Sequence, residues 1–301
     1  MTAVDATKKI TPLDKIPLKW VGMGNLKLPL KMIFEAKKAN LRKELLLTAK
    51  INAFVDLVKP SRGIHMSRIY STLQEFSETS IVNLKEFKDL ALRILATHTD
   101  LSRAVRLDIE LEVPFFKKSL KSELAYQQVY PLKILLQKTH DILECFLELR
   151  IDYSSTCPQS AALSKEIFIQ QLSQQSTKEE ILQFIEQNGL LATPHAQRSQ
   201  LDVTIKLKMQ NVEELSLVNW TQEIIEKLEQ CLGTPTQGLV KRVDEQQFAV
   251  LNAQNLMFCE DAARKIFLCL DAEKWQEGFW GNVSHFESLH SHDAIAHFSK
   301  V

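Results

Sequence analysis

Apolar and polar residues alternate almost strictly in three stretches of the chain. In residues 105–113, 143–153 and 203–209, every second position holds Val, Leu, Ile, Cys, Met or Tyr. A period of two places these residues on one side of a strand, so each stretch is predicted to be a strand with one buried and one solvated face. Less regular apolar segments predict two short strands or a hairpin at 16–34, strands at 45–58 and 124–137, and a final extended pair within 280–299.

Apolar residues spaced three and four apart predict helices between these strands. Two helices are expected in the first half of the chain, at 64–76 and 83–98. Two more are expected in the second half, at 219–232, where Gly233 is a stop signal, and at 254–276.

A further helical segment, at about 161–190, is inserted into the second half. The run 176–179 (Ser-Thr-Lys-Glu) has the form of a capping box, and Gly189 is a candidate helix end. An apolar stripe follows the cap, at Ile181, Leu182, Phe184 and Ile185. Because such a stripe ordinarily faces a core, we interpret the insertion as a helical hairpin that packs on the body of the protein.

The predicted elements follow the order strand, strand, helix, helix, strand, strand, and the second half repeats this order without a repeat of residues. The pattern predicts an α+β fold of two antiparallel units with helices on one face. Residues 1–14 are expected to form a loose tail, residues 15–138 the first unit, and residues 139–301 the second unit with its insertion.

Charge and cysteine content narrow the functional classes. The 301 residues include 37 Lys and Arg against 37 Asp and Glu, so a general nucleic-acid or anionic-membrane surface is disfavoured. There is no apolar run of membrane-spanning length and no signal-peptide core at the N-terminus. The five cysteines include no C-x-x-C pair, which favours a reducing, cytoplasmic location over a disulfide framework.

Histidines gather near the end of the chain, where four of the eight lie between residues 285 and 297. In a strand, His290 and His292 would point the same way, whereas a helical turn would pair Glu287 with His290. Either geometry offers ligands to a divalent metal. The alternative to a metal site is that this segment is simply a polar, solvent-exposed end of the chain.

Other segments also carry candidate chemistry. Cys157 directly follows a predicted strand, where a side chain can enter a cleft, and His195 directly precedes one. The basic segment 60–68 joins a strand to a helix and has the arginines and helix-start amides that phosphate binding uses. The last two candidates are the charge run 241–245 and Glu260. Each of these segments also has an interpretation without chemistry: His195 as a turn histidine, 60–68 as helix capping, 241–245 as a solvated charge run and Glu260 as an exposed helical carboxylate.

Taken together and in order, these segments resemble the type IB GTP cyclohydrolases of the tunnelling-fold (T-fold) superfamily. The chain resembles one complete member from about residue 21 onward, although Gln159 stands where the family usually has a second cysteine. The motifs are R-G-I-H-M-S-R at 62–68, S-T-C-P-Q-S at 155–160, P-H-A-Q-R-S at 194–199, K-R-V-D-E at 241–245, F-C-E-D at 258–261 and F-E-S-L-H-S-H-D-A at 286–294.

The resemblance implies conversion of GTP and water to 7,8-dihydroneopterin triphosphate and formate, the first step of tetrahydrofolate biosynthesis, with one divalent metal ion (Mn, Zn or Fe) per site. The implied catalytic residues are Cys157, His195 as a proton shuttle, and Glu287. The implied metal ligands are Cys157, Glu245 and His290, with Glu287 and His292 at or near the metal. Glu260 is the implied guanine anchor, with a metal role as the alternative, and the implied triphosphate contacts are Arg62, His65, Arg68, Arg198, Lys241 and Arg242.

The resemblance also implies a fold of tandem T-fold modules, each in ββααββ order, and a cytoplasmic homotetramer with sites between subunits. Residues 62–68 would then reach the site of a neighbouring chain. Two other functions stay open on the residues alone. One is a different T-fold enzyme acting on another purine or pterin, and the other is a non-catalytic protein that binds one.

Overall fold

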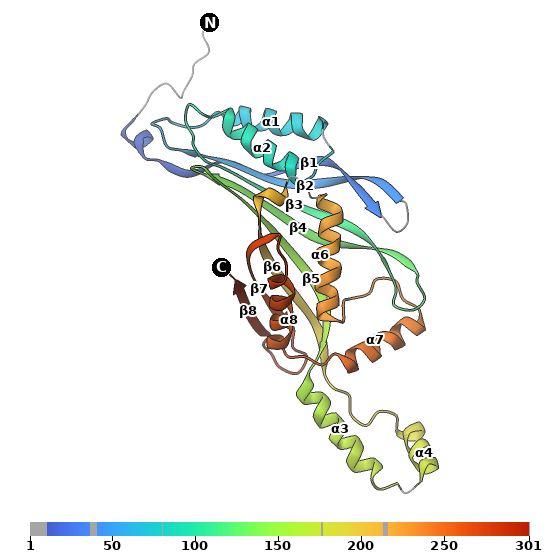
Figure 1. Cartoon of the computed structure of the whole chain (residues 1–301). Helices are drawn as coiled ribbons and strands as arrows, with labels where there is room; N and C mark the ends of the chain where they lie inside the picture. The colour runs from blue at the N-terminus through green and yellow to red at the C-terminus, as the bar shows by residue number, and fades with distance from the viewer. Residues whose placement is uncertain (1–10, 37–40, 80, 176, 213–215, 301) are drawn as a thin grey trace.

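The computed structural model describes residues 11–36, 41–79, 81–175, 177–212 and 216–300. Across these residues the strands form one antiparallel sheet, in which the spatial order from β1 to β8 follows the chain (Figure 1). Consecutive antiparallel strands need only turns or helical connections that return to the same end of the sheet. The strands are β1 (Leu18–Ala36), β2 (Leu41–Leu57), β3 (Val105–Lys118), β4 (Ala125–Thr139), β5 (Ile142–Thr156), β6 (Ala196–Leu207), β7 (Gln276–His285) and β8 (Ala294–Lys300).

Helices from the β2–β3 and β6–β7 connections cover one face of the sheet (Figure 1). The predicted alternation is confirmed there, since Leu107, Ile109, Leu147, Ile151 and Ile205 are buried in the common core. The expected α+β architecture is thus correct. The helices are α1 (Met66–Thr79) and α2 (Leu84–Ala96) between β2 and β3, α3 (Pro158–Leu172) and α4 (Lys178–Asn188) between β5 and β6, and α5 (Met209–Val212), α6 (Leu217–Leu232), α7 (Arg242–Gln254) and α8 (Cys259–Asp271) between β6 and β7.

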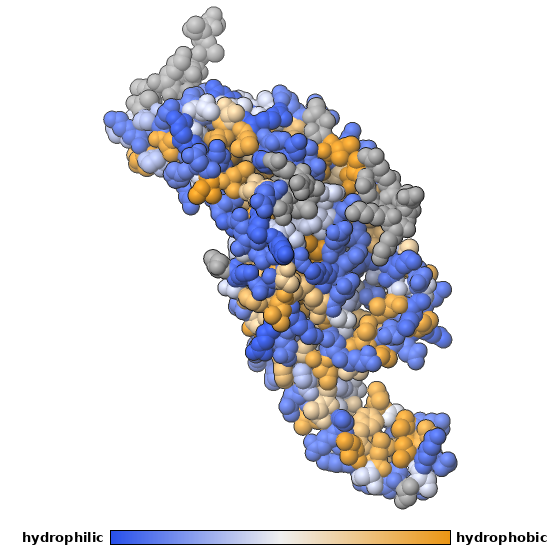
Figure 2. Space-filling view, viewed as in Figure 1, coloured by the Kyte–Doolittle hydropathy of each residue, from blue (hydrophilic) through white to orange (hydrophobic). Residues whose placement is uncertain are grey.

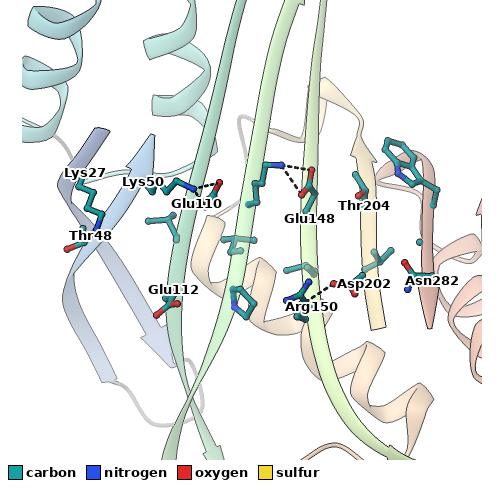
Figure 3. Close-up of a pocket in the computed structure, with 18 residues that line it drawn as sticks. Lys27, Thr48, Lys50, Glu110, Glu112, Glu148, Arg150, Asp202, Thr204 and Asn282 are labelled. Atoms are coloured by element: carbon teal, nitrogen blue, oxygen red, sulfur yellow. Dashed lines mark hydrogen bonds and ion pairs between the residues drawn. The ribbon is translucent and has the colours of Figure 1, made fainter. Parts of the chain in front are cut away.

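The other face of the sheet carries charged side chains in cross-strand pairs (Figure 3). Lys133 lies 3.1 Å from Glu148, and Arg150 lies 2.7 Å from Asp202. These pairs line a cavity of about 630 Å³. Their partial exposure is what the polar positions of half-buried strands predict.

The prediction of two short strands or a hairpin at 16–34 is wrong, because β1 is one long strand. Gly22 does not form a turn: a Cβ there would lie 2.0 Å from the carbonyl oxygen of Ala53, so glycine permits close approach of β2. A register shift between Met23 and Leu26 includes Asn25 in the left-handed conformation, with φ 59°. The irregularity therefore bends the strand without ending it.

The helix predicted at 254–276 is present but shorter, as α8 from Cys259 to Asp271, whereas α7 at residues 242–254 was not predicted. Asn255 separates the two helices by donating its side-chain amide to the carbonyl oxygen of Leu232, at the end of α6. In contrast, Gly233 ends α6 as predicted, in the left-handed conformation with φ 83°.

The inserted hairpin exists, but it does not pack on the body. α3 and α4 project away from the sheet, and α4 buries none of the residues that the structure describes in it (Figure 1). None of the expected core stripe is buried: Leu182 and Ile185 are exposed, Leu182 at 51% of its full accessibility, while Ile181 and Phe184 are partly buried. Apolar surface is visible on the hairpin in Figure 2. The capping box lies one residue later than predicted, formed by Thr177 and Glu180.

Residues 1–10 of the expected tail lie outside the described residues, while Pro12–Lys15 form a short 3-10 helix. Among the helices that the structure describes, none has the length and apolarity needed to cross a membrane.

Candidate active site

The ends of β5, β6 and β7 meet at one end of the sheet. Cys157 donates its backbone N–H to the carbonyl oxygen of His195 at 3.2 Å, one step beyond the pairing of Thr156 with Ala196. Phe286 donates to the carbonyl oxygen of Arg198 at 3.1 Å, which carries β7 alongside β6 up to Glu287. The sheet therefore brings together Cys157, His195 and Glu287, the three residues implied to be catalytic.

Cys157 occupies the N-cap position of α3 and is half-buried. Its sulfur accepts a hydrogen bond from the backbone amide of Ser160 at 3.5 Å. The hydroxyl of Ser160 in turn accepts from the backbone amide of His195 at 3.2 Å. The start of α3 thus ties the two residues together across the insertion, and Pro158 at the first helical position suits a helix start.

Glu287 carries a buried carboxylate oxygen. Its Oε2 lies 3.7 Å from Nδ1 of His195 and has no hydrogen-bond partner among the described residues. A buried carboxylate oxygen without a donor is costly, so it marks a position for a cation or a donating ligand.

Polar side chains continue from His195 into the interior of the sheet. The Nδ1 atom of His195 lies 3.1 Å from Oε1 of Gln197, whose Nε2 donates to Oγ of Ser155 at 2.9 Å. The hydroxyls of Ser155 and Ser199 lie 2.7 Å apart. Gln197, Ser155 and Ser199 are all buried. Sequence reasoning missed this network, because serine and glutamine inside a strand do not stand out in a hydrophobic pattern.

A second polar pair lies beside this network. The hydroxyl of Tyr153 on β5 and Nε2 of His285 on β7 are 2.9 Å apart, and both residues are buried. Burial lowers the pKa of His285 to about 4, although the nearby carboxylates of Glu260 and Asp261 act in the opposite direction. His285 is therefore neutral at physiological pH. Its contact with Tyr153 joins β7 to β5 across β6, which lies between them in the sheet.

Glu260 lies near this end of the sheet, at the first turn of α8. Its Oε2 accepts a hydrogen bond from Sγ of Cys259 at 3.3 Å, and its charge acts on His285. The residue is exposed, so its carboxylate is accessible to a ligand.

The charge run 241–245 begins α7, and Asp244 is its buried member. Asp244 accepts hydrogen bonds from the backbone amides of Lys121 and Ser122, at 2.7 and 2.9 Å, and from the hydroxyl of Ser122. Burial alone would raise the pKa of the Asp244 carboxyl, but the Ser122 hydroxyl and the amides of Lys241, Ser122 and Lys121 outweigh burial and hold it well below its usual range. Reading the whole run as solvated charge is therefore wrong for Asp244, which fastens the β3–β4 loop to α7.

The exposed members of this run face solvent. Glu245 lines an open cavity of about 460 Å³, together with Arg198, Gln197 and Tyr153. Lys241 and Arg242 are exposed at the start of α7. The structure thus places Glu245 and Arg198 at one cavity beside the strand ends.

His290 and His292 lie in the loop between β7 and β8, in neither the strand nor the helical turn considered from the sequence. Their rings stack 5.1 Å apart and are exposed. Within the described ranges, no three His, Cys, Asp or Glu side chains are grouped as metal ligands. A single chain thus does not gather Cys157, Glu245, His290 and His292 into one cluster.

The basic segment 62–68 lies at the opposite end of the sheet from Cys157. It follows β2, whose Val55 pairs with Val105, which pairs with Lys138 near the β4–β5 turn. Arg68 donates to the carbonyl oxygen of Thr97 at 2.7 Å and to Asp100 at 3.2 Å, and the backbone oxygen of His65 contacts His98. The structure therefore separates Arg62, His65 and Arg68 from the other predicted site residues of the same chain.

Known proteins are similar to this chain in fold and in sequence. A solved structure of uricase from Arthrobacter globiformis is similar with a TM-score of 0.53 and 7% identity, covering 94% of this chain and 93% of the uricase chain, which shows a shared fold. A GTP cyclohydrolase FolE2 from Pseudoalteromonas translucida is 38% identical over 93% of this chain and 91% of the relative. Another, from Hydrogenovibrio crunogenus, is 36% identical over 94% of this chain and 89% of the relative. The model of the family described as "Type I GTP cyclohydrolase folE2" matches residues 4–296, and the chain therefore belongs to this family.

Proposed function

We propose that this chain catalyses the GTP cyclohydrolase I reaction, in which GTP and water give 7,8-dihydroneopterin triphosphate and formate, at the end of β5, β6 and β7. The product enters tetrahydrofolate biosynthesis. The observation that supports this location most strongly is the convergence of Cys157, His195 and Glu287 on three adjacent strand ends. Membership of the family supports the activity itself.

The site is proposed to hold one divalent ion, Mn, Zn or Fe. The buried, unpartnered Oε2 of Glu287 fits a cation, and thiolate, carboxylate and imidazole donors suit these metals. Cys157, Glu245 and His290 would hold the ion, with Glu287 and His292 at or near it. When bound, such an ion lowers the pKa of coordinated water and so makes hydroxide available at neutral pH.

His195 is proposed to move protons during the reaction. Hydrolysis at C8 of the purine opens the imidazole ring, and the nitrogen that leaves C8 must receive a proton. An imidazole exchanges protons readily near neutral pH, which suits this task. The position of His195 between Cys157 and Glu287 supports the assignment.

The remaining contacts are proposed to bind GTP. Glu260 would accept hydrogen bonds from N1–H and the 2-amino group of guanine, because a carboxylate offers two acceptors side by side. Arg198, Lys241 and Arg242 would bind the triphosphate, whose charge needs several cationic donors. Arg62, His65 and Arg68 are proposed to act in the site of a neighbouring subunit, since they lie at the far end of their own sheet.

The architecture proposed for this function is a pair of tandem T-fold modules of the type IB enzymes. β1–β4 with α1 and α2 would form the first module, and β5–β8 with the later helices the second, meeting at the turn after β4. A cytoplasmic homotetramer would bring opposite ends of different sheets together. The shared fold with uricase is consistent with this proposal.

The test is formation of formate and a fluorescent pterin from GTP with added Mn²⁺ or Zn²⁺. We expect turnover by the unmodified protein and its loss in Cys157→Ala. Cys231→Ala is a matched control, because Cys231 is also half-buried but lies on α6. Absence of turnover with every common divalent metal, in assembled protein, contradicts the proposal, as does a clear preference for another purine nucleotide.

A further inference from the structure

The α3–α4 hairpin carries a cluster of exposed apolar side chains. On α4, Leu182 and Ile185 lie one turn apart and are both exposed. Glu179 and Glu186 lie three residues before and four residues after Leu182, so the same face of α4 also carries two exposed carboxylates. A single exposed apolar residue is ordinary, whereas a cluster indicates an interaction surface. The exposed apolar residues of the hairpin are Leu163, Ile167, Ile169, Leu182, Ile185 and Leu190.

A second cluster of exposed apolar side chains lies at the opposite end of the sheet, where residues 11–19 and 58–68 meet. Ser61 donates its backbone N–H to the carbonyl oxygen of Asp14 at 3.2 Å, which joins these two segments. We call them the basic corner, because together they contain five Lys and Arg against one Asp. The exposed apolar residues of the basic corner are Leu13, Ile16, Leu18, Val58 and Met66.

The hairpin and the basic corner are opposite in charge, since residues 158–190 contain four Glu against two Lys. We propose that the hairpin of one chain docks on the basic corner of a second copy of this chain. The contact buries apolar side chains on both surfaces and places carboxylates of one against cations of the other, which selects this pairing. Two hairpins packed on each other would instead bring like charges together.

The hairpin does not reach the basic corner of its own chain. Across the sheet, Val55 near the end of β2 is level with Leu143 at the start of β5. The hairpin leaves β5 after Thr156, at the other end of that strand, roughly 40 Å further along at about 3.3 Å per residue. Figure 1 shows α3 and α4 beyond one end of the sheet and the blue Pro12–Lys15 helix at the other. The contact is therefore between chains.

Two chains related by a two-fold axis make this contact twice. In such an interface the hairpin of each chain meets the basic corner of the other, so the pair is closed and self-complementary. The same contact brings Arg62 of one chain towards the start of α3, and so towards Cys157, in the other. That agreement rests on the proposed function, whereas the docking contact rests on the two surfaces themselves.

The first experiment locates the contact in the full-length protein. Unlabelled and ¹⁵N-labelled chains are unfolded together, reassembled, and treated with a carbodiimide, which joins a carboxylate to an amine beside it. We expect cross-links from Glu179 or Glu186 to Lys15 or Lys59. About half of these links should join a labelled to an unlabelled chain, because a contact between randomly mixed copies requires it.

The second experiment exchanges the charges. Glu179→Lys with Glu186→Lys should raise the protein concentration at which the assembly dissociates by about 10-fold or more, as measured by sedimentation velocity. Lys15→Glu with Lys59→Glu should have the same effect. All four changes together should restore the original dissociation, because the charges are then exchanged across the contact. Damage to folding would not be repaired in this way.

Glu123→Lys with Glu226→Lys is the matched control, because it adds the same charge at exposed residues outside both surfaces. It should leave dissociation unchanged. The proposal is overturned by cross-links confined to single chains or joining two hairpins, by a chain that stays monomeric, or by no recovery in the four-residue exchange. If assembly follows the exchange while GTP is not turned over, the proposed function fails and the contact stands, so the two failures are distinguishable.

Discussion

The backbone amide of Cys157 and the backbone carbonyl of His195 are hydrogen-bonded at 3.2 Å, although α3 and α4 lie between them in the chain. Two residues that are distant in sequence thus form the closing step of the β5–β6 ladder. The insertion leaves and re-enters the sheet at one point, and the site does not depend on the length of the connection between these residues.

Removal of the hairpin is the first prediction from this relationship. Replacing residues 163–190 with a short glycine-rich linker should preserve folding and most of the GTP turnover, because among the described residues of both helices only Ser164 is buried. Shortening a loop changes its closure entropy only slightly. Thermal unfolding and turnover of the shortened chain check this prediction. Loss of folding would show that the hairpin has a stabilising partner.

Asp244 gives a prediction about stability. Asp244→Ala should lower the melting temperature markedly, because three donors of the β3–β4 loop, two amides and a hydroxyl, lose a buried acceptor. Glu245→Ala, one residue along and exposed, should leave the melting temperature nearly unchanged. Calorimetry or circular dichroism of both variants makes the comparison. Equal melting temperatures would contradict the role of Asp244 as an anchor.

Sequence patterns predicted the elements whose burial is periodic. The alternation at 105–113 and 143–153 was sufficient for β3 and β5, because the alternating apolar residues from Val105 to Val113 and from Cys145 to Tyr153 are buried in one core. The same reasoning failed for the hairpin stripe around Leu182, which is amphipathic without facing a core. Periodicity shows that a face is apolar, but it does not show what covers that face.

From the sequence, the site residues were predictable only where they end a periodic apolar segment. Cys157 and His195 stand at strand ends, and cysteine and histidine are residue types that bind metals and transfer protons. Gln197 and Ser155 lie inside strands and meet through the pairing of β5 with β6, which depends on a register that no single segment encodes. Likewise, the separation of Arg62 from Cys157 follows from sheet order, which local sequence does not specify.

Cys145 gives a prediction about pH. Burial raises the pKa of this thiol to about 12, whereas an exposed cysteine titrates near ~8.5. The folded state therefore keeps its proton while the unfolded state loses it, so the stability due to this group is complete below about 8.5 and declines as pH rises towards 12. Denaturant unfolding between these values should show a slope that is less steep in Cys145→Ala, by at most about 1.4 kcal/mol per pH unit. An equal slope in both proteins would contradict the prediction.

Glu287 gives a prediction about metal affinity. Glu287→Gln replaces a buried, unpartnered carboxylate with a neutral amide of the same shape, and should weaken binding of zinc by about 10-fold or more. Equilibrium dialysis measures this without reference to activity. Glu277→Gln is the control, because Glu277 lies on β7 but pairs with Lys206 at 3.3 Å. Equal affinities in the two variants would place the metal elsewhere.

Mixed oligomers test whether two chains share one site. Arg62 and Cys157 lie at opposite ends of one sheet, so a shared site would combine Arg62 of one subunit with Cys157 of another. Arg62→Ala and Cys157→Ala should each be inactive alone. When the two variants are unfolded together and reassembled, random pairing should restore about one quarter of the sites, because each site then has an even chance of receiving either intact end.

A second mixture makes this experiment decisive. Cys157→Ala and His195→Ala alter the same end of the same sheet, where the two backbones are hydrogen-bonded. A site built from that end always contains one altered residue, whichever chain supplies it, so this mixture should stay inactive. Recovery in the first mixture and not in the second shows a site shared between subunits. No recovery in either mixture would instead require Arg62 and Cys157 to act in separate places.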